Sequence, residues 1–345
     1  MKKLLSCALV LALLCVLLPC AAHGGDGCTL LVATDPHFIA PSLTDHGPHF
    51  TALTENSDGK LMKYSEEIMD AFLAEAIAQK PEALLLTGDL TFNGALLSHS
   101  ALAAKLHDAE AAGVRIYVLT GNHDLDNPNA ALFSGAEFQR VPFAESADFR
   151  RIYADFGFDE ALSIDTDSLS YVVDLNNDTR LLMLDCNTRH DPCGISDRSL
   201  EWVEEQLKAA RDAGRMILAA GHQNLFQLTV FRAGYVIDKA DRLADLLRQY
   251  GVTLYLSGHL HCQHWKTEDG LTEIATSALA VSPCQYGVLT VSGDKLSYQT
   301  KETDVSAWAM EQGRTEAELH AMDSAVPHCP APVSVVTPFR PCFFA

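Results

Sequence analysis

TLLVATDPH, residues 29–37, is a short apolar run that ends in the polar residues Asp35-Pro36-His37. ALLLTGD, residues 83–89, repeats this arrangement, with an apolar run over residues 83–87 that ends at Gly88-Asp89. Between the two runs, residues 65–79 carry apolar side chains at helical spacing, so the segment predicts strand, helix and strand. Two strands joined by a helix indicate a crossover connection and parallel pairing, which are typical of α/β folds.

The alternation of strands and helices continues along the chain. The next expected elements are a helix over residues 96–112 and strands over residues 114–120, 181–184, 216–220 and 252–257. After Gly258 the pattern changes to short strands separated by turn signals, which favour antiparallel pairing. The residues alone therefore predict an α/β domain whose mostly parallel sheet is covered on both faces and closed at one end by antiparallel strands.

Two long stretches interrupt this alternation, residues 38–64 and residues 125–167. Each of them begins directly after a polar cluster at a strand end. Loops of this length inside a compact domain commonly act as lids or binding loops, and surface elaboration without a function is the alternative. We expect residues 38–64 to border the functional site and to limit the size of its substrate.

The chain begins with a basic and then an apolar segment, Met1-Lys2-Lys3 followed by a run from Leu4 to Leu18. This order is typical of a secretory signal, and the run is short for a transmembrane span. Residues 1–24 are therefore expected to form a signal peptide. The sequence Leu17-Leu18-Pro19-Cys20 also resembles a lipoprotein signal, so a membrane tether through a lipidated Cys20 is the alternative to simple secretion. Both routes predict an exported protein, either extracellular or in the cell envelope.

The composition excludes some classes of function. The 345 residues include 45 Asp and Glu against 25 Lys and Arg, a formal net charge of -20. A surface of this sign repels a phosphate backbone, so general nucleic-acid binding is excluded. Hydrophobic residues make up 48% of the chain and charged residues 20%, which indicates a globular protein and neither a disordered nor a fibrous one.

Most of the expected strands before the antiparallel region end in residues of the types that bind metal ions. The strand over residues 181–184 is the exception. These strand ends are Asp35-Pro36-His37, Gly88-Asp89, Gly121-Asn122-His123-Asp124, Gly221-His222 and Gly258-His259-Leu260-His261. A single Asp or His at a strand end is more often a turn residue or a helix cap. The carboxyl ends of strands in an α/β sheet converge on one crevice, however, so this repetition predicts a common site.

The residue types indicate which metal ions and which chemistry to expect. Carboxylate, amide and imidazole ligands together favour divalent or trivalent first-row ions such as Mn, Fe, Zn or Co over Ca or Mg. The candidates outnumber the ligands of one ion, so two ions are expected. Two ions about 3.5–4 Å apart can share a water and clamp the oxygens of an in-line displacement. The chemistry implied is hydrolysis, with a phosphoester as the natural substrate.

In order and type these residues resemble the calcineurin-like metallophosphoesterases. The blocks that carry the resemblance are Asp35-x-His37, Gly88-Asp89, Gly121-Asn122-His123-Asp124, His222 and Gly258-His259-x-His261. The resemblance implies a four-layer α-β-β-α sandwich of two mixed sheets flanked by helices, with a dinuclear centre at the strand ends. It implies a metallophosphoesterase domain over residues 29–300 and leaves residues 301–345 as a C-terminal tail without an assigned role.

The resemblance also implies a role for each residue of the site. One ion would be held by Asp35, His37, Asp89 and His261, and the other by Asp89, Asn122, His222 and His259. Asp89 would then bridge the two ions. His123 would contact the phosphate and help the leaving group to depart. Asp124 would orient the His123 imidazole, with helix capping as the alternative role for Asp124.

The function expected is that of an exported metal-dependent phosphoesterase, which hydrolyses small-molecule phosphomonoesters or phosphodiesters by attack of a metal-bridging hydroxide. One alternative is a surface-displayed binding protein with a structural metal site, which would have no use for His123. A dinuclear peptidase is another alternative, but it leaves the pairing of Asn122 with His123 unexplained. Outside these motifs, Asn93-Gly94 is expected to be a turn, with a substrate contact as the alternative. His46 and His49 are expected to be ordinary loop residues, with a place in the lining of the site as the alternative.

Overall fold

The computed structural model describes residues 28–292, 295–314 and 334–338, the last of these by its backbone alone. The expected signal peptide, residues 1–24 with Cys20, lies outside the described residues, as does most of the C-terminal tail. Within the described ranges, no helix has both the length and the apolar character needed to cross a membrane.

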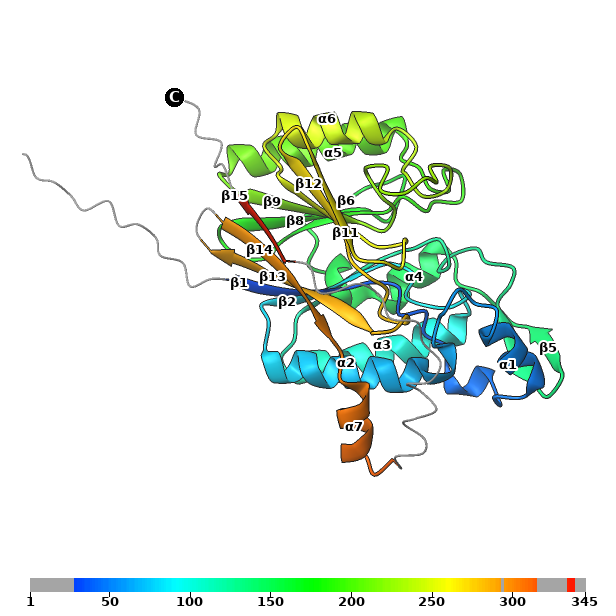
Figure 1. Ribbon diagram of the computed structural model, residues 1–345. Coiled ribbons are helices and arrows are strands. Elements are labelled where there is room, and N and C mark those ends of the chain that lie inside the picture. The colour runs from blue at the N-terminus through cyan, green and yellow to red at the C-terminus, as the bar shows by residue number, and fades with distance from the viewer. Residues whose placement is uncertain (1–27, 293–294, 315–333, 339–345) are drawn as a thin grey trace, which may run out of the picture.

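The described strands form two large sheets and a separate hairpin (Figure 1). The first sheet has the order β15-β14-β13-β1-β2-β3. Its parallel part consists of β1 (Cys28–Ala33), β2 (Ala83–Thr87) and β3 (Ile116–Leu119). The antiparallel part consists of β13 (Gln285–Ser292), β14 (Lys295–Glu302) and β15 (Ser334–Pro338). The apolar run that opens the chain's domain therefore lies in the middle of the sheet.

The second sheet has the order β11-β12-β10-β9-β8-β7-β6. Its centre is parallel and consists of β8 (Thr179–Leu184), β9 (Met216–Gly221), β10 (Leu254–Ser257) and β12 (Leu271–Ala275). Antiparallel strands complete its edges, namely β6 (Ser163–Ile164), β7 (Tyr171–Asp174) and β11 (His264–Glu268). Both large sheets are therefore mixed.

Helices cover the outer face of each sheet, and the sheets face each other in the middle of the molecule (Figure 1). The first sheet carries α2 (Ser65–Gln79) and α3 (Leu96–Ala111), and the second carries α5 (Asp197–Asp212) and α6 (Ala240–Gln249). Side chains of both sheets, such as Leu85 and Leu218, share one buried apolar core. The four-layer α-β-β-α architecture is confirmed.

The expectation from the residues alone, that helices cover both faces of one sheet, is wrong. Each sheet has helices on one face only, because the other face is buried against the second sheet. An alternation of strands and helices looks the same whether the chain extends one sheet or moves to another. Every residue of β2 is buried, and this pattern also fits either arrangement.

The two stretches that interrupt the alternation pack against each other. The first contributes α1 (Pro48–Thr54) and the second the hairpin of β4 (Ala131–Ser134) and β5 (Glu137–Arg140). The rings of Phe50 and Phe133 lie 5.5 Å apart in an apolar cluster distinct from the main core. The Asp45 carboxylate accepts the backbone N–H of Gly135 at 2.7 Å. The two stretches therefore form one small substructure.

The remaining helical segments are short. They are α4 (Ser146–Ile152), α7 (Val305–Glu311), which packs against α2, and the single turns η1 (Pro41–Leu43), η2 (Met62–Tyr64) and η3 (Ala154–Phe158). The segment directly after β14 is therefore attached to the helical layer of the first sheet.

Tyr171 links the two sheets, because its buried hydroxyl on β7 donates to the carbonyl of Val118 on β3 at 2.9 Å. Tyr171→Phe leaves this buried carbonyl without its donor, so we expect the free energy of unfolding to fall by about 1–3 kcal/mol in chemical denaturation. The matched control is Tyr250→Phe, since the Tyr250 hydroxyl meets Glu204 at the surface. Equal losses in the two variants would contradict a stabilising bond between the sheets.

Candidate metal centre

The carboxyl ends of strands from both sheets meet at one place. Asp35 and His37 follow β1, Asp89 follows β2, His222 follows β9, and His259 and His261 follow β10. Their ligand atoms form two groups, Asp35 with His37, Asp89 and His261, and Asp89 with His222 and His259, each within 4.8 Å. Asp89 belongs to both groups. The structure thus brings together every Asp and His that was expected to bind metal.

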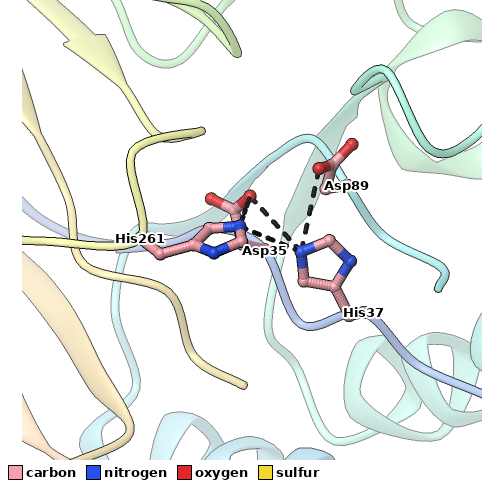
Figure 2. Close-up of side chains that lie close together, drawn as sticks. All are labelled: Asp35, His37, Asp89 and His261. Carbon is pink, nitrogen blue, oxygen red and sulfur yellow. Dashed lines mark hydrogen bonds and ion pairs between the residues drawn. The ribbon is translucent and has the colours of Figure 1, made fainter. Parts of the chain in front are cut away.

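Figure 2 shows the first group, in which two carboxylates and two imidazoles point toward one another. His261 Nε2 lies 3.2 Å from Asp35 Oδ1, and the Nε2 atoms of His37 and His261 are 3.1 Å apart. His37 Nε2 lies 3.7 Å from Asp35 Oδ1 and 3.7 Å from Asp89 Oδ2. In the second group, His222 Nε2 lies 3.3 Å from Asp89 Oδ2. The same two carboxylate oxygens therefore face all of these imidazoles.

Each carboxylate has one oxygen that is held in place and one that is open. Asp35 Oδ2 accepts the backbone N–H of His259 at 2.9 Å and the Thr34 hydroxyl at 2.7 Å. Asp89 Oδ1 accepts the backbone N–H of His123 at 2.8 Å. Asp35 Oδ1 and Asp89 Oδ2 are buried and find no hydrogen-bond partner among the described residues. We call these two atoms the open oxygens.

His222 is oriented in the same way. Its Nδ1 donates to the carbonyl of Thr87 at 2.9 Å, so its Nε2 is turned toward the open oxygens and is the nitrogen that would bind a metal ion after losing its proton. This Nε2 is also buried without a partner within the described part of the chain. An unpaired buried polar atom costs about 1–3 kcal/mol, and a bound cation would remove this cost. The donor set of carboxylate oxygens and imidazole nitrogens therefore fits a first-row metal ion.

The charges of the site reinforce this fit. Burial raises the pKa of Asp35, but the His222 and His261 imidazoles outweigh it and hold that pKa below its usual range. Burial is likewise outweighed at Asp89, where His222 and His123 keep the pKa well below its usual value. Burial disfavours a charge on His222, yet the two carboxylates raise the pKa of His222 to about 10. Both carboxylates are therefore ionised at neutral pH, and their charge attracts cations.

The backbone of the site is held in an unusual conformation. The φ angles are 51° at Asp35, 41° at His37, 47° at Asp89, 66° at His259 and 57° at His261. Residues other than glycine rarely adopt the left-handed region, and each such residue costs on the order of 1–3 kcal/mol. The surrounding structure maintains these conformations at every one of these ligand positions.

Two glycines of the motifs make room for the ligands. A Cβ atom on Gly121 would overlap the backbone nitrogen and Oδ1 of Asp89. One on Gly258 would overlap the Thr34 hydroxyl and press on Asp35 Oδ2. Glycine therefore precedes Asn122 and His259 because the backbone passes directly against the carboxylates.

His123 lies beside the two groups. Its Nδ1 donates to the carbonyl of Phe92 at 2.6 Å, which fixes the tautomer and turns Nε2 toward the centre, 3.9 Å from Asp89 Oδ2. The ring meets His37 edge-on, with centroids 4.8 Å apart. The side chain is 31% exposed, so a substrate can reach it.

The prediction that Asp124 orients His123 is wrong, because the carbonyl of Phe92 does so. The buried Asp124 carboxylate instead accepts the backbone N–H groups of Gly121, Leu90 and Thr91 at 2.8–3.0 Å. Burial and the Asp89 charge raise the pKa of Asp124 to about 7. Asp124 therefore joins the loop after β2 to the loop after β3.

Asn122 is exposed and lines a pocket of about 410 Å³ together with Arg189 and Asn187. Its role as a metal ligand stays a prediction. The sequence did not indicate the backbone carbonyls that orient the imidazoles of the site. They include those of Thr87, Phe92 and Gly234, the last of which binds His259 Nε2 at 2.9 Å. Any residue type supplies a carbonyl, so no sequence signal could have identified them.

Comparisons with known proteins agree with this geometry. The family model of the calcineurin-like phosphoesterases matches residues 28–263. A probable cyclic nucleotide phosphodiesterase from Rhodococcus erythropolis is 26% identical, over 59% of this chain and 59% of its own length. Human tartrate-resistant acid phosphatase type 5 is 30% identical, over 47% of this chain and 48% of its own length. The chain thus spans about half of the length of the curated relatives that it matches.

Solved structures share the fold. A dimetal phosphatase from Danio rerio superposes with a TM-score of 0.61 at 12% identity, over 80% of this chain and 96% of that chain. The purple acid phosphatase PPD1 from yellow lupin gives a TM-score of 0.54 at 13% identity, over 81% of this chain and 52% of that chain. Since the family model covers more than half of the chain, including every residue of the two ligand groups, the chain belongs to the calcineurin-like phosphoesterase family, a family of metal-dependent phosphoester hydrolases.

Proposed function

We propose that the protein is an exported metal-dependent phosphoesterase that hydrolyses phosphomonoesters or phosphodiesters of small molecules. The observation that carries this proposal is the pair of open oxygens, Asp35 Oδ1 and Asp89 Oδ2, which face imidazoles in a buried, negatively charged site. Membership of the phosphoesterase family supports the same class of reaction.

The ligands divide into two sets that share one residue. Asp35, His37, Asp89 and His261 would hold one ion, and Asp89, Asn122, His222 and His259 the other. The donor types suit Mn, Fe, Zn or Co. Bound ions would supply a coordinated water that ionises near neutral pH and would neutralise charge on the phosphoryl oxygens.

The protein itself supplies the proton for the leaving group. Because the Phe92 carbonyl retains the proton on His123 Nδ1, the proton that His123 exchanges is carried by Nε2, which faces the site. A protonated Nε2 can donate to the oxygen that departs from phosphorus. The backbone N–H of His123 also donates to Asp89 Oδ1, so the positions of His123 and Asp89 are fixed relative to each other. A purely structural metal site would gain nothing from a partly exposed imidazole in this position.

His123→Ala is expected to lower kcat by about 10²–10⁴-fold for an alkyl phosphate, because an alkoxide leaves poorly without a proton. The loss should be much smaller for 4-nitrophenyl phosphate, whose leaving group needs no proton. Metal content, measured by elemental analysis, should stay at the wild-type value.

The matched control is His107→Ala, which removes a half-exposed imidazole from α3, outside both ligand groups, and should leave kcat unchanged. Loss of metal in His123→Ala, or an equal loss of rate for the two leaving groups, would refute the role of His123 as the acid.

The proposal of export rests on Lys2-Lys3 and the apolar run from Leu4 to Leu18. It predicts that the mature chain begins between about Cys20 and Gly27, as mass spectrometry of the protein from its native cells would show. A diacylglyceryl mass on Cys20 would identify a lipoprotein, and its absence simple secretion. Intracellular protein that keeps Met1 would contradict export.

A further inference from the structure

A pocket of about 350 Å³ adjoins the metal centre, and His123 is part of its wall. The remaining walls come from α1, from the hairpin of β4 and β5, and from the loops after β2 and β3. Three phenylalanines, Phe92, Phe133 and Phe138, are among its apolar lining residues, together with Leu53 and Ala131. The two long stretches that interrupt the fold therefore meet at this pocket.

The aromatic walls are held in place before any ligand arrives. Phe133 is 5% exposed and packs in the apolar cluster with Phe50. His49 stacks on Phe133 with ring centroids 5.8 Å apart, and it lies 5.1 Å from Phe138. The Arg140 guanidinium lies over the Phe138 ring at 4.9 Å. A ligand would not need to order these side chains, which lowers the entropy cost of binding.

Phe138 forms the rim of the pocket, and it is 47% exposed. Exposed large apolar side chains next to a cavity often mark a binding site, because a ligand can cover them. Asn93, which was expected to be a plain turn residue, is buried in the wall, and its Nδ2 donates to the carbonyl of Asn129 at 3.2 Å. His49 likewise lines the pocket and is more than an ordinary loop residue.

The position of His123 indicates which part of a substrate would lie in this pocket. In the proposed function, His123 Nε2 gives a proton to the leaving oxygen. The phosphorus would lie on the side of the metal ligands. The carbon group on the leaving oxygen would then extend past His123 into the pocket. The pocket is therefore placed for the organic part of the leaving group.

We propose that this pocket binds an aromatic group carried on the leaving oxygen, so that phosphoesters with an aromatic ring close to phosphorus are preferred substrates. The proposal rests on the proposed function. A cavity of about 150 Å³ lined by apolar side chains binds benzene, so the volume here accommodates a ring and its linker. Aromatic walls favour an aromatic ligand over an aliphatic one, by about 2- to 12-fold in affinity for each ring pair.

Two esters isolate the contribution of the ring, benzyl phosphate and methyl phosphate. Their leaving alcohols have similar acidity, so a difference in kcat/KM reports binding of the ring and not the chemistry of departure. If the enzyme prefers diesters, the same comparison is made between benzyl methyl phosphate and dimethyl phosphate. The wild type should prefer the benzyl ester in whichever pair it hydrolyses.

Two variants alter the pocket without touching the metal ligands. Phe138→Ala removes one aromatic wall and should lower the benzyl-to-methyl ratio of kcat/KM by about 3- to 10-fold. Asn129→Met places a longer side chain without a ring at the exposed edge of the pocket and should lower the ratio as well, because it narrows the pocket and adds no aromatic wall. The matched control is Leu162→Ala, a side chain that is 55% exposed and lies outside the pocket, and it should keep the wild-type ratio.

Phosphonates separate failure of the pocket from failure of the proposed function, since their phosphorus–carbon bond is not hydrolysed. Calorimetry should show that Mn-loaded wild type binds benzylphosphonate more tightly than methylphosphonate, and that Phe138→Ala loses this preference. If neither ester is hydrolysed but this pattern of affinities holds, the pocket stands and the hydrolytic function fails. If the wild type shows no preference for the ring in either assay, or if both pocket variants keep it in full, the pocket proposal is overturned.

Discussion

The structure depends on how two buried carboxylates are held. Asp35 and Asp89 each have one oxygen fixed by hydrogen bonds and one open toward the imidazoles. The donor to Asp35 is the backbone N–H of His259, which belongs to the loop after β10 in the second sheet, whereas Asp35 follows β1 in the first. The same bond therefore orients a ligand and joins the two sheets at the site. The left-handed conformations of the ligand residues, and the glycines at 121 and 258, follow from bringing these loops so close.

Much of this arrangement could be predicted from the sequence, because it depends on residue type and spacing. The helix over residues 65–79 and the strand over residues 83–87 have the predicted bounds. The Asp and His ligands were found because they follow apolar runs, and the ends of parallel strands converge whichever sheet they belong to. The second sheet was not visible in the residues alone and came only from the family resemblance, since helix and strand periodicity does not say which strands are neighbours.

The errors have physical reasons as well. Asp124 stands beside His123 in sequence, but adjacent residues on a tight turn point in different directions, and its carboxylate meets the N–H groups of another loop. The hairpin of β4 and β5 was missed because its second strand is exposed on every residue and has no apolar alternation. It is stabilised by packing against α1, which comes from a distant part of the chain. Contacts of this kind decide the shape of the pocket next to the metal centre, so the sequence indicated the reaction better than the substrate.

The most direct test of the central claim is anomalous X-ray diffraction from crystals grown with Mn. Two anomalous peaks are expected on either side of Asp89, one among Asp35, His37 and His261 and the other beside Asn122, His222 and His259. A single peak, or peaks that do not share Asp89, would contradict the account of a dinuclear centre built on the two open oxygens.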